Sequence, residues 1–67
     1  MAEQSLSILR RKAVELRCGL SRSSIYDAVR EGRFPAPVRI GRRAVGWVAS
    51  EVDAWLAAQV ERSRKSA

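Results

Sequence analysis

The 67-residue sequence contains no histidine and a single cysteine, Cys18. One cysteine cannot form an internal disulfide, which favours a reducing cytoplasm. Without histidine, the chain lacks the ligands of an ordinary tetrahedral zinc site and the usual base that activates a thiol or hydroxyl nucleophile. Walker and Gly-x-Gly-x-x-Gly motifs are also absent. We therefore expect no metal, no cofactor and no enzymatic activity.

Long apolar runs are absent as well. No segment approaches the roughly 18 consecutive apolar residues of a membrane span. The first residues, MAEQSLSILRRK, lack the apolar stretch of a signal peptide. The sequence therefore predicts a cytoplasmic protein with no membrane partner.

Acidic residues are scarce relative to basic ones. The chain has 13 Lys plus Arg against 7 Asp plus Glu, a formal net charge of +6. Residues 10–43 hold ten of the basic residues and only three acids. A strongly basic segment favours a polyanionic partner, and arginine pairs bidentately with phosphate and with guanine. We expect double-stranded DNA as the partner, with a solvated basic surface as the alternative.

Apolar residues at helical spacing predict a first helix near residues 10–17. Gly19 follows as the expected left-handed residue that ends it. The predicted apolar stripe consists of Leu9, Ala13, Leu16 and Leu20.

A second helix is predicted to begin after Ser21, whose hydroxyl can cap a free amide of the first turn. Leu20 and Ile25 have the spacing of a hydrophobic staple across this start. Gly32 is the expected end, with Pro35 just beyond it. Two short helices joined by a tight turn that contains glycine form a helix-turn-helix.

The pattern then changes to a period of two, which predicts a two-stranded β-hairpin around the turn Gly41-Arg42-Arg43. Its expected inner face consists of Val38, Ile40, Val45 and Trp47. Two strands alone are marginally stable, so the hairpin must pack on the helices. Trp47 and Trp55 are expected to be core residues rather than base-stacking platforms.

The last helix is predicted to begin at Ser50, where Ser50-Glu51-Val52-Asp53 resembles a capping box. Its expected apolar face is Val52, Trp55, Leu56 and Val60. The predicted fold is α+β, mostly α: a winged helix-turn-helix over residues 8–61, with a C-terminal helix after the wing. Flexible tails are expected at 1–7 and 62–67.

Exposed polar residues on the second helix and the hairpin are the candidate DNA contacts. At 100° per residue, with Ile25 inward, the second helix turns its polar residues outward, as a recognition helix does. The candidates there are Arg22, Ser23, Ser24, Tyr26 and Arg30, and those on the wing are Arg39, Arg42 and Arg43. Asp27 lies on the same face. It either accepts a hydrogen bond from cytosine or orients Arg30, and we prefer the second role.

Four segments, in order, resemble the AlpA-type phage regulators, which have a MerR-like helix-turn-helix and are similar to phage excisionases. They are residues 19–26 (GLSRSSIY), 31–35 (EGRFP), 45–47 (VGW) and 50–56 (SEVDAWL). The resemblance covers about residues 8–60. It implies a DNA-binding protein of a prophage or integrated element, with residues 22–26 in the recognition helix and 42–43 at the wing tip. Asp27 and Cys18 depart from the residues more usual in that family.

Two functions follow as hypotheses. The first is a sequence-specific DNA-binding protein that regulates transcription or acts as an excisionase. Its partners would be DNA and an integrase or RNA polymerase, and it would be a nucleoid-associated bacterial monomer that assembles cooperatively on repeated sites. The alternative is a winged-helix module that binds an integrase or host factor with little affinity for DNA.

Overall fold

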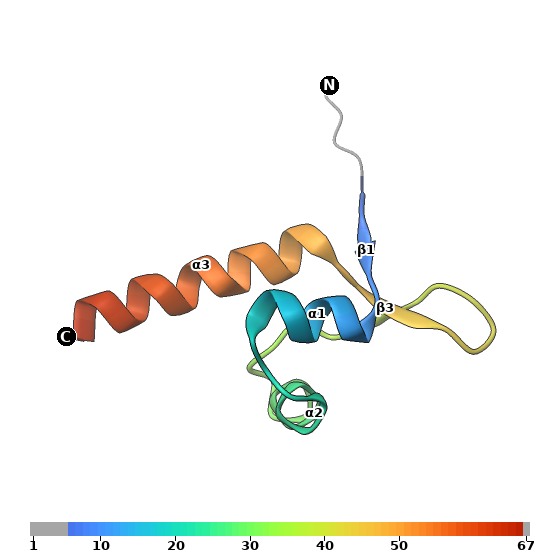
Figure 1. Cartoon of the computed structure of the whole chain (residues 1–67), viewed down its shortest axis with the longest axis horizontal. Helices are drawn as coiled ribbons and strands as arrows, with labels where there is room; N and C mark the ends of the chain where they lie inside the picture. Colours follow the sequence, from blue (N-terminus) through green and yellow to red (C-terminus); the bar gives the residue numbers. More distant parts are fainter. Residues whose placement is uncertain (1–5, 67) are drawn as a thin grey trace.

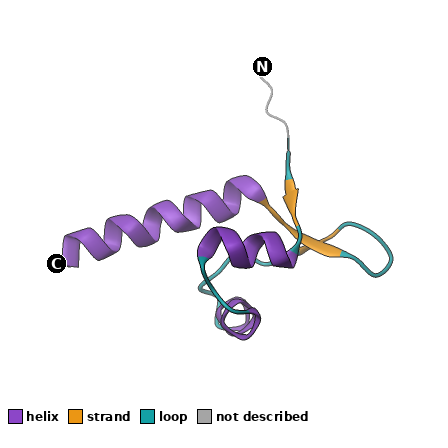
Figure 2. Ribbon diagram, viewed as in Figure 1, coloured by secondary structure: helices purple, strands orange, loops and turns teal. Residues whose placement is uncertain are grey.

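A computed structural model describes residues 6–66 of the chain. Within these residues the fold is α+β and mostly helical, as predicted (Figures 1 and 2). The elements in chain order are β1 (Ile8–Leu9), α1 (Arg11–Cys18), α2 (Arg22–Arg30), β2 (Val38–Arg39), β3 (Val45–Val48) and α3 (Ala49–Ser66). This arrangement is consistent with the predicted winged helix-turn-helix.

The sheet has a third strand that the sequence did not indicate. Its order is β1-β3-β2, with β3 antiparallel to both neighbours. Leu9 lies opposite Trp47 in the register of β1 and β3. The two-stranded prediction was incomplete because Leu9 also fits a helical stripe, and a strand of two residues has too little pattern to be distinguished from it.

The predicted inner face of the hairpin was wrong in part. Arg39 lies directly opposite Val45, and Val38 opposite Gly46. Because side chains alternate along a strand, Arg39 shares a face with Val45 and Trp47, and Val38 belongs to the opposite face. That opposite face includes Ile8 and Ile40, since a Cβ added at Gly46 would meet both of their side chains.

In α1, the predicted end was confirmed and the predicted apolar stripe was not. Gly19 is left-handed (φ 69°), and its N–H donates to the Glu15 carbonyl over 2.8 Å. Val14 is the buried residue of this helix, whereas Leu16 is 86% exposed. The predicted phase was wrong because Leu9 lies in β1, before the helix begins, and so does not share its periodicity.

The predicted start of α2 was confirmed. The Ser24 N–H donates to Ser21 Oγ over 3.1 Å, so Ser21 is the N-cap. Ile25 and Ala28 form the buried face of the helix. After the helix, Gly32 is left-handed (φ 75°), and the chain turns toward residues 33–35.

Both tryptophans join the end of α2 to the rest of the fold. Trp47 is fully buried, and its Nε1 donates to the Pro35 carbonyl over 2.8 Å. The half-buried Trp55 donates from Nε1 to the Arg33 carbonyl over 2.6 Å. The Phe34 ring packs edge-on against Trp55, with centroids 4.8 Å apart. The buried core consists of Val14, Ile25, Ala28, Phe34, Trp47 and Val52.

The last helix differs from its predicted bounds at both ends. It begins at Ala49, so Ser50 lies inside it rather than capping it. The Ala49 N–H is satisfied by the Ser7 carbonyl over 2.8 Å. At the other end the helix continues past residue 61 to Ser66, extending beyond α1 and α2 (Figure 1). The predicted N-terminal tail lies largely in residues 1–5, which are outside the described residues.

Candidate nucleic-acid interface

The outer surface of α2 carries most of the candidate DNA contacts. Arg22, Ser23 and Arg30 are exposed, and Tyr26 is half-buried. The Tyr26 ring packs against Trp47, with centroids 6.1 Å apart. On its other side, the Arg22 guanidinium carbon lies 5.9 Å from the Tyr26 ring centroid, within the range of a cation–π contact. Tyr26 is therefore held in place by the core while its hydroxyl end remains accessible.

Asp27 is paired with Arg30 on the same exposed face. Arg30 donates from Nη2 to Asp27 Oδ1 over 2.5 Å, and both side chains are more than half exposed. This geometry agrees with the preferred prediction, that Asp27 orients Arg30. The pair leaves the centre of the α2 surface close to neutral.

Ser24 is separated from the other candidates. Besides its part in the Ser21 cap, it lines a hollow on the opposite flank of α2, together with Asp27 and Trp55. The structure therefore does not bring Ser24 together with Tyr26, although both are on the same helix.

The wing consists of β2, β3 and the loop between them. The Ile40 N–H donates to the Ala44 carbonyl over 2.9 Å, which closes a tip formed by Gly41, Arg42 and Arg43. Arg39, Arg42 and Arg43 are all exposed. Although the register puts Arg39 on the same face of the sheet as Val45, its side chain is exposed and accessible to a phosphate.

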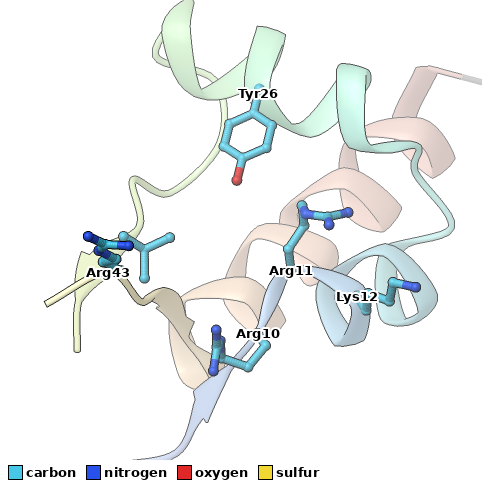
Figure 3. A pocket seen from close by; sticks show the side chains of 6 residues that line it. Arg10, Arg11, Lys12, Tyr26 and Arg43 are labelled. Atoms are coloured by element: carbon cyan, nitrogen blue, oxygen red, sulfur yellow. The ribbon is translucent and has the colours of Figure 1, made fainter. Parts of the chain in front are cut away.

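A cationic pocket connects the wing to both helices (Figure 3). It is an open hollow of about 240 Å³. Its lining residues are Arg10, Arg11, Lys12, Tyr26, Arg43 and Val45. Figure 3 shows the Tyr26 hydroxyl directed toward the space between Arg43 and the start of α1. We call this hollow the cationic pocket.

Sequence reasoning missed the contribution of the start of α1 to this site. Arg10, Arg11 and Lys12 counted toward the net charge, but no pattern joined them to Tyr26 or Arg43, which are distant in sequence. One local signal was available. Three consecutive cations at the start of a helix oppose the positive end of its dipole, and α1 has no acid in its first turn and no side-chain cap.

The lining of the cationic pocket suits an oxyanion. It contains four cationic side chains, one phenolic hydroxyl and no carboxylate. Arg11 forms an ion pair with Glu15, in which Arg11 Nη1 donates to Glu15 Oε2 over 2.5 Å. Arg10, Lys12 and Arg43 form no ion pair with any of residues 6–66. Guanidinium groups and hydroxyls together are the donors that proteins use to bind phosphate.

The described residues show no arrangement suited to metal binding or to thiol chemistry. No group of three His, Cys, Asp or Glu side chains there is arranged to hold a metal ion. Burial raises the pKa of the Cys18 thiol, and Asp53 adds to this effect, whereas Arg17 opposes it. The thiol is therefore held in its less reactive, neutral form. None of the helices in residues 6–66 has the length and apolar character needed to cross a membrane.

Comparison with known proteins identifies the family. Residues 7–60 match the family model described as prophage CP4-57 regulatory protein (AlpA). The chain belongs to the AlpA family. The matched residues include the whole wing, both helices of the helix-turn-helix and most of α3.

This AlpA-family chain is similar in sequence to two further proteins. It is 34% identical over 58 residues to the DNA-binding transcriptional activator AlpA of Escherichia coli K12, covering 78% of this chain and 83% of that protein. It is 51% identical over 43 residues to an uncharacterised protein, ORF88, of Enterobacteria phage P4. That match covers 64% of this chain and 49% of ORF88, so this chain spans about half the length of the phage protein.

Proposed function

We propose that this chain is a sequence-specific DNA-binding protein of a prophage or integrated element that has no enzymatic activity. It regulates transcription, directs an integrase toward excision, or does both. The observation that carries the proposal is the cationic pocket, in which the start of α1, Tyr26 in the middle of α2 and the wing tip contribute donors to one surface. The similarity to AlpA, a DNA-binding transcriptional activator, supports the same function.

In this mechanism, α2 lies in the major groove and the wing follows the adjacent backbone. Arg22 and Ser23 reach base edges from the first turn of the helix, and Arg30 is oriented by Asp27. Arg39, Arg42 and Arg43 bind phosphates or an adjacent narrow groove. Ser24 contacts DNA from the other flank of α2 through its side chain, because its backbone amide already donates to the Ser21 hydroxyl.

The chain acts as a monomer in solution and assembles on repeated DNA sites. Of the predicted apolar face of α3, Val52, Trp55 and Leu56 are used within the fold, whereas Val60 is 46% exposed. One exposed valine does not supply the repeated heptad positions of a coiled-coil dimer. One domain of this size covers a short site, about 1,000 Å² at most. Neighbouring copies, or an integrase or RNA polymerase, then supply additional contacts. Binding to chromosomal DNA makes the protein a nucleoid component of the cytoplasm.

Genomic footprinting with the purified chain tests the proposal. We expect protected sites that share a sequence, survive an excess of random duplex and lie near a promoter or an attachment site of the element. Protection confined to attachment sites would favour excision over transcriptional control. Uniform protection would contradict sequence-specific binding, and absent protection would favour the protein-interaction module.

A further inference from the structure

We infer that the cationic pocket is a clamp for a single backbone phosphate, held jointly by Arg10, Tyr26 and Arg43. Arg11 and Lys12 add positive charge at its edge. The inference rests on the proposed DNA binding and deepens it. One defined phosphodiester, rather than the duplex backbone in general, occupies the pocket and sets the position of α2 in the groove.

The first argument is convergence. Arg10 immediately precedes α1, Tyr26 is on α2 and Arg43 is at the wing tip, yet all three line one hollow (Figure 3). An open hollow of about 240 Å³ admits a phosphate group that remains attached to a DNA strand. Scattered phosphate contacts along a backbone do not require such convergence.

The second argument concerns uncompensated charge. Residues 6–66 offer no carboxylate to Arg10 or Arg43, whereas Arg17, Arg30 and Arg33 all have acidic partners. Arg10, Arg11 and Lys12 also stand at the positive end of α1, where a cation is unfavourable in the absence of an anion. A bound phosphate would reverse both effects at once.

The third argument is the Tyr26 hydroxyl. It makes no hydrogen bond to any of residues 6–66 and points into the pocket. Its ring is fixed against Trp47 and beneath Arg22, so the hydroxyl reaches the pocket without ordering a mobile side chain. Because the other polar groups of the lining are cationic, the hydroxyl is placed to donate its hydrogen to an anionic oxygen bound among them.

A clamp of this kind positions the reading helix. A phosphate held from both α2 and the wing fixes the height and rotation of α2 relative to the bases. Tyr26 is therefore a positioning residue. Its loss is expected to reduce affinity for the specific site more than affinity for random DNA, although it touches no base.

Methylphosphonate scanning provides the test. The full-length chain is titrated against the footprinted duplex in which one phosphate at a time is replaced by an uncharged methylphosphonate. We expect one position, on one strand, to reduce affinity about tenfold or more, as loss of a charged, multiply bonded phosphate should. In the Tyr26→Phe and Arg43→Ala variants, whose clamp is already weakened, the methylphosphonate at that position should cause little further loss of affinity.

Salt dependence separates the roles of these two residues. Tyr26→Phe removes a donor but no charge, so it should lower affinity about tenfold without changing the slope of log K against log salt. Arg43→Ala should make the slope shallower by about 0.9. Tyr26→Phe retains the ring that packs against Trp47, and circular dichroism should confirm that both variants remain folded.

Arg42 supplies the matched control, since it neighbours Arg43 at the wing tip but does not line the pocket. Arg42→Ala should weaken binding to the same extent on the native duplex and on the duplex with the critical methylphosphonate. If no single phosphate is critical, or if Arg43→Ala and Arg42→Ala behave alike, the clamp is refuted while DNA binding stands. If the wild-type chain protects no site, the proposed function itself fails.

Discussion

Arg30 donates a hydrogen bond to Asp27 across 2.5 Å on the outer face of α2. The two residues are three apart, so the contact closes within one helical turn. In the proposed complex with DNA, α2 offers one oriented guanidinium and an adjacent negative charge. Arg10, Lys12 and Arg43 at the cationic pocket form no ion pair with residues 6–66, so Asp27 reduces the positive charge of α2 without reducing that of the pocket.

Replacing Asp27 should therefore loosen selectivity. In Asp27→Asn, Arg30 loses its ion pair and the face loses one negative charge, so its net charge becomes more positive. We expect binding to random DNA to strengthen about two- to fivefold, the range of an exposed ion pair, with a smaller gain or a loss on the specific site. Competition between specific and random duplexes measures the ratio. An unchanged ratio would show that Asp27 has no part in orienting Arg30 on DNA.

Arg22 should be important for base reading. Its place at the first position of α2 and its contact with Tyr26 hold it at the exposed end of the helix. We expect Arg22→Ala to lose about 1–3 kcal/mol on the specific site and less on random DNA. Lys65→Ala, at the projecting end of α3, is the charge-matched control. Equal losses on both duplexes would assign Arg22 to the backbone instead.

Gly46 should tolerate no side chain. A Cβ at this position would lie 2.4 Å from Ile8 Cγ2 and 3.0 Å from the Leu9 carbonyl oxygen. We expect Gly46→Ala to reduce the free energy of unfolding by about 1–3 kcal/mol because β1 must move away. Urea denaturation measures the loss.

Gly41→Ala is the matched control for that substitution. Its Cβ would meet only Ala44 Cβ, at an ordinary 3.7 Å, so its effect on stability should be small. Combining Gly46→Ala with Ile8→Ala should recover part of the loss. A Gly46→Ala chain as stable as the wild type would contradict the pairing of β1 with β3.

Local signals were sufficient to predict the helix-turn-helix from the sequence. Ser21 as the N-cap and Gly19 as the left-handed residue depend on interactions within a few positions, and both occur as predicted. The wing turn was predictable for the same reason. Each of these features is decided by neighbours in sequence rather than by packing.

Features that depend on pairing between distant residues were not predictable. Residues on both sides of the wing turn alternate, but alternation within each strand does not specify which face of one strand lies beside which face of the other, so more than one inner face is possible. The one that forms is set by the pairing of Arg39 with Val45. The strand Ile8–Leu9 exists only because β3 offers it an edge. The cationic pocket depends in turn on this packing, which brings Arg10 close to Arg43.

The proposed monomer can be tested by sedimentation of the free chain beside gel shifts on DNA with one, two or three sites. We expect a monomer at micromolar concentration and tighter binding per site on repeats, since one domain covers too little DNA for high affinity. A stable dimer without DNA would overturn this expectation and point to the exposed half of α3. Equal affinity per site on all three duplexes would exclude cooperative assembly.

The salt dependence of DNA binding tests the central claim most directly. If the three wing arginines, Arg30 and one or two cations at the start of α1 meet phosphates, about five or six phosphates are neutralised. The slope of log K against log salt should then lie at about −4 to −6, at roughly −0.9 per phosphate. A slope shallower than about −2 would contradict a DNA-binding surface built on these residues and favour a protein partner.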